Sequence, residues 1–368
     1  MKRFISLILA CVLMMSMAAC GASSPVQAED TEEITVNETA AAETTVAETA
    51  AAETMPETEP TAEDNLFLKV SSINFSLVGE SDDIYLGLAP REMVTWESED
   101  PGIVSVENGV LTANGVGTTT IRATYQDCQV SCSAGCLAQT QEELEQLDPE
   151  ILSAPKRLPP EVNLDEPCTY FDDSVMMGDS LTYLLWQYES VNDYLGEMSF
   201  VSRHGISLYG VVDRFKNMYY QGQEMYIEDI IASVEAQRVY ILLGCLDYQV
   251  PVHTKNLMNN WEALSRKIEE KAPDKEIIIV SNIPCFQETT QPAKYNEDVA
   301  AAAPKIRQFA SDKGYGYLDL GYYIQDHFGR MPKIYSKDLY HINDEGNQVW
   351  MKLLRFYAQF EHEGGTLA

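Results

Sequence analysis

The chain has 368 residues, with 57 acidic and 25 basic side chains and a formal charge of −32 at pH 7. So large an excess of negative charge argues against nucleic acid as a partner, because the phosphate backbone would be repelled. The length allows two folded domains in addition to segments that carry no core of their own.

Residues 1–20 have the features of a processing segment. Lys2 and Arg3 give a positive start, and the apolar run that follows, 4–17, is too short for an ordinary membrane span. The run ends in Met17-Ala18-Ala19-Cys20, which resembles the bacterial lipobox. That resemblance implies cleavage before Cys20 and lipid attachment to its sulfur, so that the protein is exported and anchored to the membrane on its extracytoplasmic side. The alternative is an ordinary signal peptide followed by a chance cysteine.

Residues 21–64 are of low complexity, with Glu-Thr pairs recurring between alanines. The segment holds twelve acidic residues and neither Lys nor Arg. It has too few apolar residues to bury a core, which predicts a disordered acidic linker. We therefore interpret the acidity as that of a solvated stalk and not of a metal site.

Residues 65–138 favour a small all-β sandwich. Short strand-like runs cover residues 73–77, 93–96, 103–106, 110–112 and 119–125, and turn signals such as Asn108-Gly109 separate them. The run from Trp96 through Asn108-Gly109 to 117–121 resembles the bacterial Ig-like group 2 domain. We find no catalytic constellation in it, and Trp96 is expected in the core.

Residues 139–167 are predicted to be a connector, with a short acidic helix and several prolines. Export permits disulfides, and a pair such as Cys136 with Cys168 is one of several that the spacing leaves open. A structural zinc site is disfavoured, since no histidine lies near these cysteines at ligand spacing. Cys245 and Cys285 are expected as buried free thiols.

From 168 to 362 the pattern alternates between strands and helices. Strands are predicted at 174–177, 198–202, 238–243, 276–281 and 316–320, and helices at 181–189, 208–218, 227–236, 254–271, 293–313 and 345–360. The near-continuous apolar runs 239–243 and 277–280 are typical of strands buried on both faces of a parallel sheet. Right-handed crossovers place the carboxyl ends of such strands at one edge, where ligands bind.

Two motifs meet at this edge. Ser180 follows the turn Gly178-Asp179 after the first strand, and His341 precedes the last helix. A serine hydroxyl is a weak nucleophile until a base takes its proton, and histidine is the usual base. Asp338, three residues before His341, can orient the imidazole through Nδ1–H. The order of the motifs therefore predicts an acyl-transferring serine.

Gly178-Asp179-Ser180-Leu181 resembles the first block of the SGNH, or GDSL, hydrolase family, and Asp338 with His341 is similar to its last block. The resemblance covers residues 168–362. It implies a flavodoxin-like α/β three-layer sandwich with a parallel sheet, and the catalytic residues Ser180, Asp338 and His341. It also implies an oxyanion hole that is formed by the backbone N–H groups of Ser180 and Gly205.

The third block departs from the family pattern. Where the family usually has Gly-x-Asn-Asp, this chain has Gly244-Cys245-Leu246-Asp247. The asparagine would be a third oxyanion donor, and Leu246 cannot donate. Gln249 and Asn282 are candidates to replace it.

The sequence therefore predicts an extracytoplasmic serine esterase that hydrolyses short acyl esters, acetyl being favoured, through an acyl-Ser180 intermediate. The expected substrate is an acylated carbohydrate or cell-wall polymer, and neither a metal nor an organic cofactor is implied. Two alternatives stay open at this point. One is a non-hydrolytic SGNH-like module that binds a glycan, and the other is an acyltransferase that uses a sugar as acceptor.

Overall fold

The computed structural model describes residues 66–162, 168–215, 217–286 and 292–362. The predictions for residues 1–20 and 21–64, including the lipid site at Cys20, lie outside the described residues.

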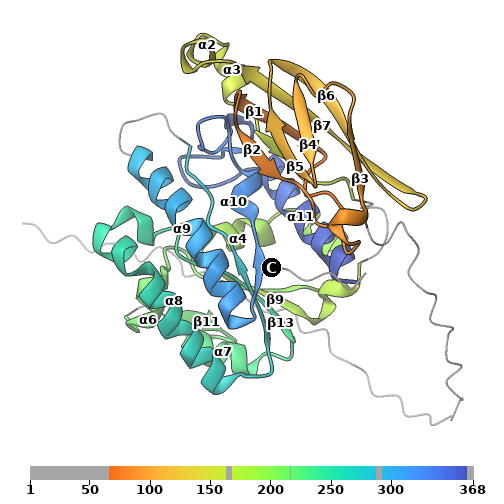
Figure 1. Ribbon diagram of the computed structural model, residues 1–368. Helices are drawn as coiled ribbons and strands as arrows, with labels where there is room; N and C mark the ends of the chain where they lie inside the picture. The colour runs from red at the N-terminus through yellow and green to blue at the C-terminus, as the bar shows by residue number, and fades with distance from the viewer. Residues whose placement is uncertain (1–65, 163–167, 216, 287–291, 363–368) are drawn as a thin grey trace, which may run out of the picture. The chain divides into compact units, whose positions relative to one another are not determined.

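Two β-sheets form the first part of the described chain (Figure 1). One has the strand order β3-β6-β7-β1-β8 and the other the order β2-β5-β4. The predicted turn at Asn108-Gly109 joins β4 to β5 with positive φ angles of 49° and 83°, as a tight hairpin requires. The all-β prediction is met here, whereas the bacterial Ig-like resemblance stays a prediction. The strands are β1 (Ser72–Leu77), β2 (Ser81–Asp83), β3 (Thr95–Ser98), β4 (Val104–Glu107), β5 (Val110–Ala113), β6 (Gly117–Tyr125), β7 (Cys128–Ala138) and β8 (Arg157–Leu158).

The predicted connector contributes to this sheet. It contains the helices α2 (Gln141–Glu145) and α3 (Pro149–Leu152), and its strand β8 pairs antiparallel with β1 through Ser72 and Leu158. Strand β8 was not predicted, because a strand of two residues has no periodicity to detect. Cys136 and Cys168, considered above as a disulfide pair, are both free thiols.

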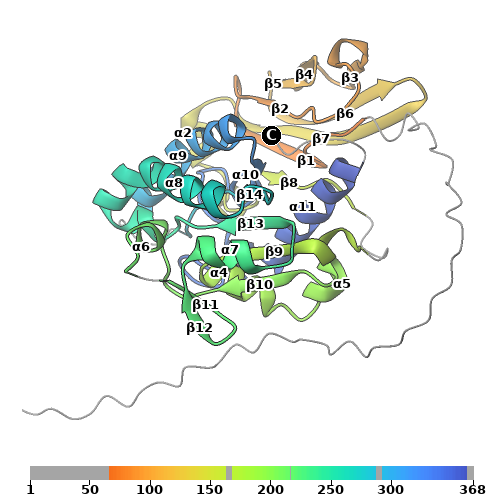
Figure 2. The same cartoon turned by 90° about the horizontal axis from the view of Figure 1, so that it is seen from below.

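The second part contains a five-stranded sheet in which every pairing is parallel. Its order is β10-β9-β13-β14-β15, so the first strand along the chain lies second from the edge, as in flavodoxin-like sheets. Figure 2 shows β14, β13, β9 and β10 side by side. Their bounds are β9 (Ser174–Gly178), β10 (Ser199–Ser202), β13 (Arg238–Leu242), β14 (Glu276–Val280) and β15 (Gly316–Leu318).

Alternate residues of these strands enter two separate hydrophobic clusters, one on each face. Met176 and Tyr240 belong to one cluster, and their neighbours Val175 and Val239 belong to the other. One cluster includes residues of α4 (Ser180–Trp186), α5 (Val191–Leu195), α10 (Leu320–Tyr323) and α11 (Asp344–His362), and the other those of α6 (Leu208–Val212), α7 (Ile227–Ser233), α8 (Pro251–Lys271) and α9 (Pro292–Lys313).

Among the helices of the described residues, none combines the length and the apolar character that a membrane span requires.

One predicted helix is too long. The segment 208–218 is helical only to Val212, and a hairpin of β11 (Met218–Tyr220) and β12 (Gln223–Met225) follows. Arg214 has a positive φ of 61°, a left-handed conformation that does not continue a helix. The turn of the hairpin uses Gln221 and Gly222, both with positive φ. Few residues of 218–225 show the apolar alternation that predicts a strand.

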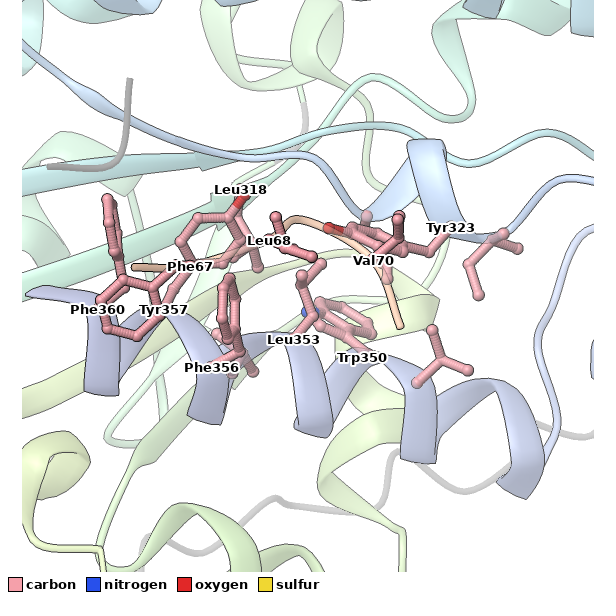
Figure 3. Packing of buried hydrophobic residues seen from close by; sticks show 14 of the residues in the cluster. Phe67, Leu68, Val70, Leu318, Tyr323, Trp350, Leu353, Phe356, Tyr357 and Phe360 are labelled. Carbon is pink, nitrogen blue, oxygen red and sulfur yellow. The ribbon is translucent and has the colours of Figure 1, made fainter. Parts of the chain in front are cut away.

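The two parts share a hydrophobic core. Phe67, which precedes β1, packs edge-to-face against Phe356 and Phe360 of α11, with ring centroids 6.1 Å and 5.4 Å apart. Leu66, Phe67 and α11 belong to one continuous cluster of buried residues (Figure 3). The helix that follows the His341 loop is therefore covered by the segment that leads into the β-sheets.

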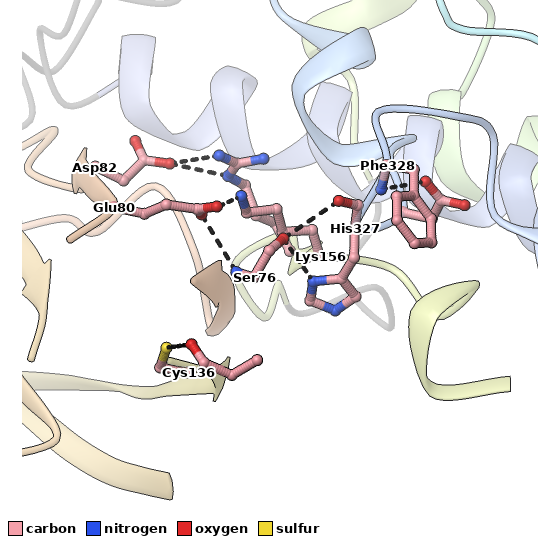
Figure 4. A network of polar contacts seen from close by, with 10 residues as sticks. Ser76, Glu80, Asp82, Cys136, Lys156, His327 and Phe328 are labelled. Carbon is pink, nitrogen blue, oxygen red and sulfur yellow. Dashed lines mark hydrogen bonds and ion pairs between the residues drawn. The ribbon is translucent and has the colours of Figure 1, made fainter. Parts of the chain in front are cut away.

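Polar contacts join the same two parts (Figure 4). Ser76 on β1 lies with its Oγ 3.1 Å from Nδ1 of His327, in the loop that follows α10. Burial and the positive charge of Lys156 lower the pKa of His327 to about 4, so its ring is neutral at neutral pH. Lys156 in turn lies 2.6 Å from Glu80, which precedes β2.

Candidate active site

The serine lies on a sharp turn between β9 and α4. A β-carbon on Gly178 would come within 2.6 Å of the carbonyl oxygen of Leu242, so only glycine fits at this position. Asp179 caps α4, and its Oδ1 accepts a hydrogen bond of 2.9 Å from the N–H of Leu181. Burial raises the pKa of Asp179 to about 6. The turn thereby holds Ser180 at the first position of the helix, on the pocket wall.

The imidazole of His341 lies between Ser180 and Asp338. Its Nε2 is 2.8 Å from Ser180 Oγ, and its Nδ1 is 2.8 Å from Asp338 Oδ2. Burial would raise the pKa of Asp338, but hydrogen bonds from the N–H groups of Tyr340 and His341 and from the imidazole outweigh it and lower that pKa. An ionised Asp338 accepts Nδ1–H, which leaves Nε2 free of hydrogen and able to accept the serine proton.

Gly205 lies in the loop after β10 and lines the same pocket as Ser180. Its φ of 64° is left-handed, a conformation in which a side chain would be strained. The fully buried Asp247 fixes the chain just beyond this loop: its carboxylate accepts hydrogen bonds of 2.8 Å and 2.9 Å from the N–H groups of Leu208 and Tyr209. Asp247 therefore anchors the start of α6 and does not line the pocket.

Of the two candidates for a third oxyanion donor, Asn282 and Gln249, the structure leaves only Gln249 free to donate into the pocket. Leu246 is half-buried on the pocket wall, where it offers no donor. The Asn282 amide is already engaged: Nδ2 donates to Leu243 O at 3.0 Å, and Oδ1 accepts from Tyr248 Oη at 3.0 Å. Asn282 is therefore excluded as the replacement, whereas Gln249 is exposed and lines the pocket.

These residues surround a pocket of about 270 Å³. One end of it is closed by the buried side chains of Cys245 and Tyr295, which are 7% and 6% exposed. The other end is open, because His204, Gly205 and Gln249 are exposed. The lining residues are Asp179, Ser180, Leu181, His204, Gly205, Cys245, Leu246, Gln249, Tyr295, Tyr340 and His341.

One residue of the pocket wall, Tyr295, was not predicted from the sequence. Tyr295 comes from α9 and packs against Tyr340, which neighbours His341, with ring centroids 5.6 Å apart. No local motif marks Tyr295, because only the packing of α9 on the sheet brings it to the site. His204 also lines the pocket, and its position next to Gly205 is the sequence feature that could have pointed to it. Within the described residues, no group of three His, Cys, Asp or Glu side chains is placed to hold a metal ion.

Part of the chain matches a known family. Residues 176–349 match the model of the GDSL-like Lipase/Acylhydrolase family. This range contains the serine turn, the Gly205 loop and the Asp338–His341 loop. No curated protein matches the chain.

Several solved structures are similar to about half of the chain. A GDSL-like lipase from Bacteroides thetaiotaomicron is 13% identical, with a TM-score of 0.40 over 52% of this chain and 91% of that one. An acetyl xylan esterase from Geobacillus stearothermophilus is 16% identical, with a TM-score of 0.36 over 51% of this chain and 94% of that one. Phospholipase A1 from Streptomyces albidoflavus is 13% identical, with a TM-score of 0.35 over 50% of this chain and 98% of that one. At these scores the likenesses carry no argument about activity.

Proposed function

We propose that this protein is a serine ester hydrolase that works through an acyl-Ser180 intermediate. The observation that carries the proposal is the unbroken hydrogen-bonded chain Ser180–His341–Asp338 on the wall of a pocket, in a part of the chain that matches an acylhydrolase family. Each of the two links measures 2.8 Å, within the reach that proton transfer needs.

The reaction takes two steps. His341 Nε2 removes the proton of Ser180 as Oγ attacks the ester carbonyl, and the carbonyl oxygen becomes an oxyanion beside the N–H groups of Ser180 and Gly205. The imidazolium then gives its proton to the leaving alcohol, which departs as the C–O bond breaks. A water molecule attacks the acyl-serine with His341 again as base, and the carboxylic acid leaves.

The proposed acyl group is short, acetyl being favoured. The leaving alcohol must depart through the open end of the pocket, so the acyl group is directed towards Cys245 and Tyr295. Both side chains are buried, and the ring of Tyr295 is held by Tyr248 and Tyr340 at centroid distances of 5.5 Å and 5.6 Å. A long acyl chain would require these packed rings to move.

We further propose that the enzyme acts outside the cytoplasm, anchored by lipid at Cys20, with the Ig-like region between anchor and catalytic domain. The support is in the sequence alone: the positive start, the short apolar run and the lipobox-like ending before Cys20. Mass spectrometry of the membrane-extracted protein should find a diacylglyceryl group on Cys20. A secreted protein that begins at another residue would contradict this part of the proposal.

The test of the activity is hydrolysis of p-nitrophenyl acetate. Ser180→Ala and His341→Ala should each remove nearly all turnover, because the two residues act as one unit. Ser311→Ala, a change of an exposed serine on α9, is the matched control and should keep the wild-type rate. Wild-type turnover in Ser180→Ala would refute the mechanism, and a chain that is silent on every ester would favour the glycan-binding module.

A further inference from the structure

The open end of the pocket carries aromatic side chains. His204 lines the pocket and is exposed, and its ring meets that of Tyr183 edge-to-face, with centroids 4.4 Å apart. Tyr183 in turn meets Trp186 at 5.8 Å. We call these three residues the aromatic rim. Of the three, His204 lines the pocket, whereas Tyr183 adjoins it through its contact with His204, and Trp186 through its contact with Tyr183.

Two of the three rim residues lie on α4, the helix that begins at Ser180. Tyr183 and Trp186 are three residues apart on α4, so they share one face of that helix. Both are partly exposed, whereas Leu181 and Leu185 of the same helix are buried in the core. The positions of Ser180, Tyr183 and Trp186 are therefore fixed by the same short helix.

The chemistry of the rim suits a sugar ring. Aromatic faces provide apolar contact area for the C–H faces of a pyranose, and the edges of tyrosine, histidine and tryptophan carry polar groups that can meet hydroxyls. The exposed amide of Gln249 adds a further donor and acceptor at the same end. A long-chain alcohol would instead require a continuous apolar surface.

The charge of the pocket disfavours an alcohol that bears phosphate. Among the described residues that line the pocket none is Lys or Arg, whereas Asp179 lies on its wall. Asp338 adds a second carboxylate directly behind His341. The described lining therefore offers a phosphate group no cation to bind it.

From the aromatic rim and the charge of the pocket we infer that the alcohol part of the substrate is a neutral carbohydrate, and that its ring binds on Tyr183, Trp186 and His204. The inference rests on the proposed esterase function and specifies its substrate class. In this arrangement the acetyl group points to the closed end of the pocket and the sugar ring lies across the rim.

The first test compares two monoacetate esters that differ only in the alcohol. Acetate release from methyl 6-O-acetyl-glucopyranoside, whose other hydroxyls are free, and from ethyl acetate is measured for wild type, Tyr183→Ala and Trp186→Ala. The ratio of kcat/KM for the sugar ester to that for ethyl acetate should fall about three- to tenfold in each variant, the range expected for one aromatic contact. Trp186→Phe keeps a ring and should restore most of the ratio.

Phe328→Ala is the matched control, an exposed aromatic residue in the loop after α10. It should change neither rate constant. If the two esters lose kcat/KM equally in the rim variants, the rim supports the helix and not the sugar, and the inference is overturned.

The second test does not need activity. In Ser180→Ala, methyl 6-O-acetyl-glucopyranoside should change the tryptophan fluorescence, and the change should be lost when Trp186→Phe is added. Absence of any change that depends on Trp186 would overturn the inference. If wild type hydrolyses neither ester, the esterase proposal fails, and this titration still decides whether the rim binds sugar.

Discussion

Replacing Leu246 by asparagine would add a hydrogen-bond donor to the wall of the pocket. The backbone at this position is held from both sides: Cys245 accepts from Asn282 Nδ2 at 3.4 Å, and the buried Asp247 is bound to the start of α6. The backbone atoms from which an asparagine side chain at position 246 would extend are therefore held in place. Because Leu246 is only half-buried, the new amide would not be left unsatisfied in the core.

The size of the effect follows from what one such donor contributes. Removal of a donor from a well-formed oxyanion hole lowers kcat by about 10²–10³, or ~2.7–4 kcal/mol of transition-state stabilisation. Here no neighbouring group is arranged to orient the new amide, so only part of that span is expected. We predict that Leu246→Asn raises kcat on acetyl esters about tenfold, which corresponds to ~1.4 kcal/mol.

The assay is kcat on ethyl acetate for wild type, Leu246→Asn and Leu246→Ala, with Ser180→Ala as the blank. Leu246→Ala removes the same apolar side chain without adding a donor, so it separates the amide from the extra space. A gain in Leu246→Asn no larger than that in Leu246→Ala would refute the reasoning. If Gln249 already donates to the oxyanion, Gln249→Ala will lower kcat and Leu246→Asn will give no gain.

Three further changes test the surroundings of the site. Asp338→Asn should lose about two orders of magnitude less kcat than His341→Ala, because Asp338 only orients and stabilises the imidazole; an equal loss would contradict that role. Phe67→Ala should lower the free energy of unfolding by about 3 kcal/mol in urea titrations, as for other buried Phe→Ala changes, while Met93→Ala, exposed on the β region, should change it little. His327 has a folded pKa of about 4 against an ordinary value of 6.5, so the unfolded chain binds its proton first and stability should fall as pH drops from about 6.5 towards 4. Denaturation at pH 7 and pH 5 should show a weaker pH dependence in His327→Gln than in wild type.

The sheet of the second part could be predicted because its strands are nearly continuous apolar runs. Val239 and Ile277 belong to two such runs, and both runs are strands of the parallel sheet. Ser180 and His341 could be proposed because each lies next to an element boundary that the sequence marks, a glycine after a strand or a loop before the last helix. The 2.8 Å contact between them depends on how the sheet packs, which no local pattern shows.

The features that were not predicted depend on contacts between residues that lie far apart in the sequence. Tyr295 reaches the pocket only because α9 packs on the sheet, and β8 exists only because β1 offers it an edge. The same holds for Phe67, whose neighbours on α11 lie near the other end of the chain. Composition and periodicity act over short windows, and they cannot indicate which distant residues complete a core or a pocket.

The contact between Phe67 and α11 has a consequence for the order of folding. During synthesis Leu66 and Phe67 emerge well before Phe356 and Phe360. Until then the apolar side chains of residues 66–70 have no partner helix, and closing so long a loop is slow. We expect the His341 loop to become ordered only when α11 docks, so that the contact between His341 and Ser180 forms after α11 has packed against Phe67.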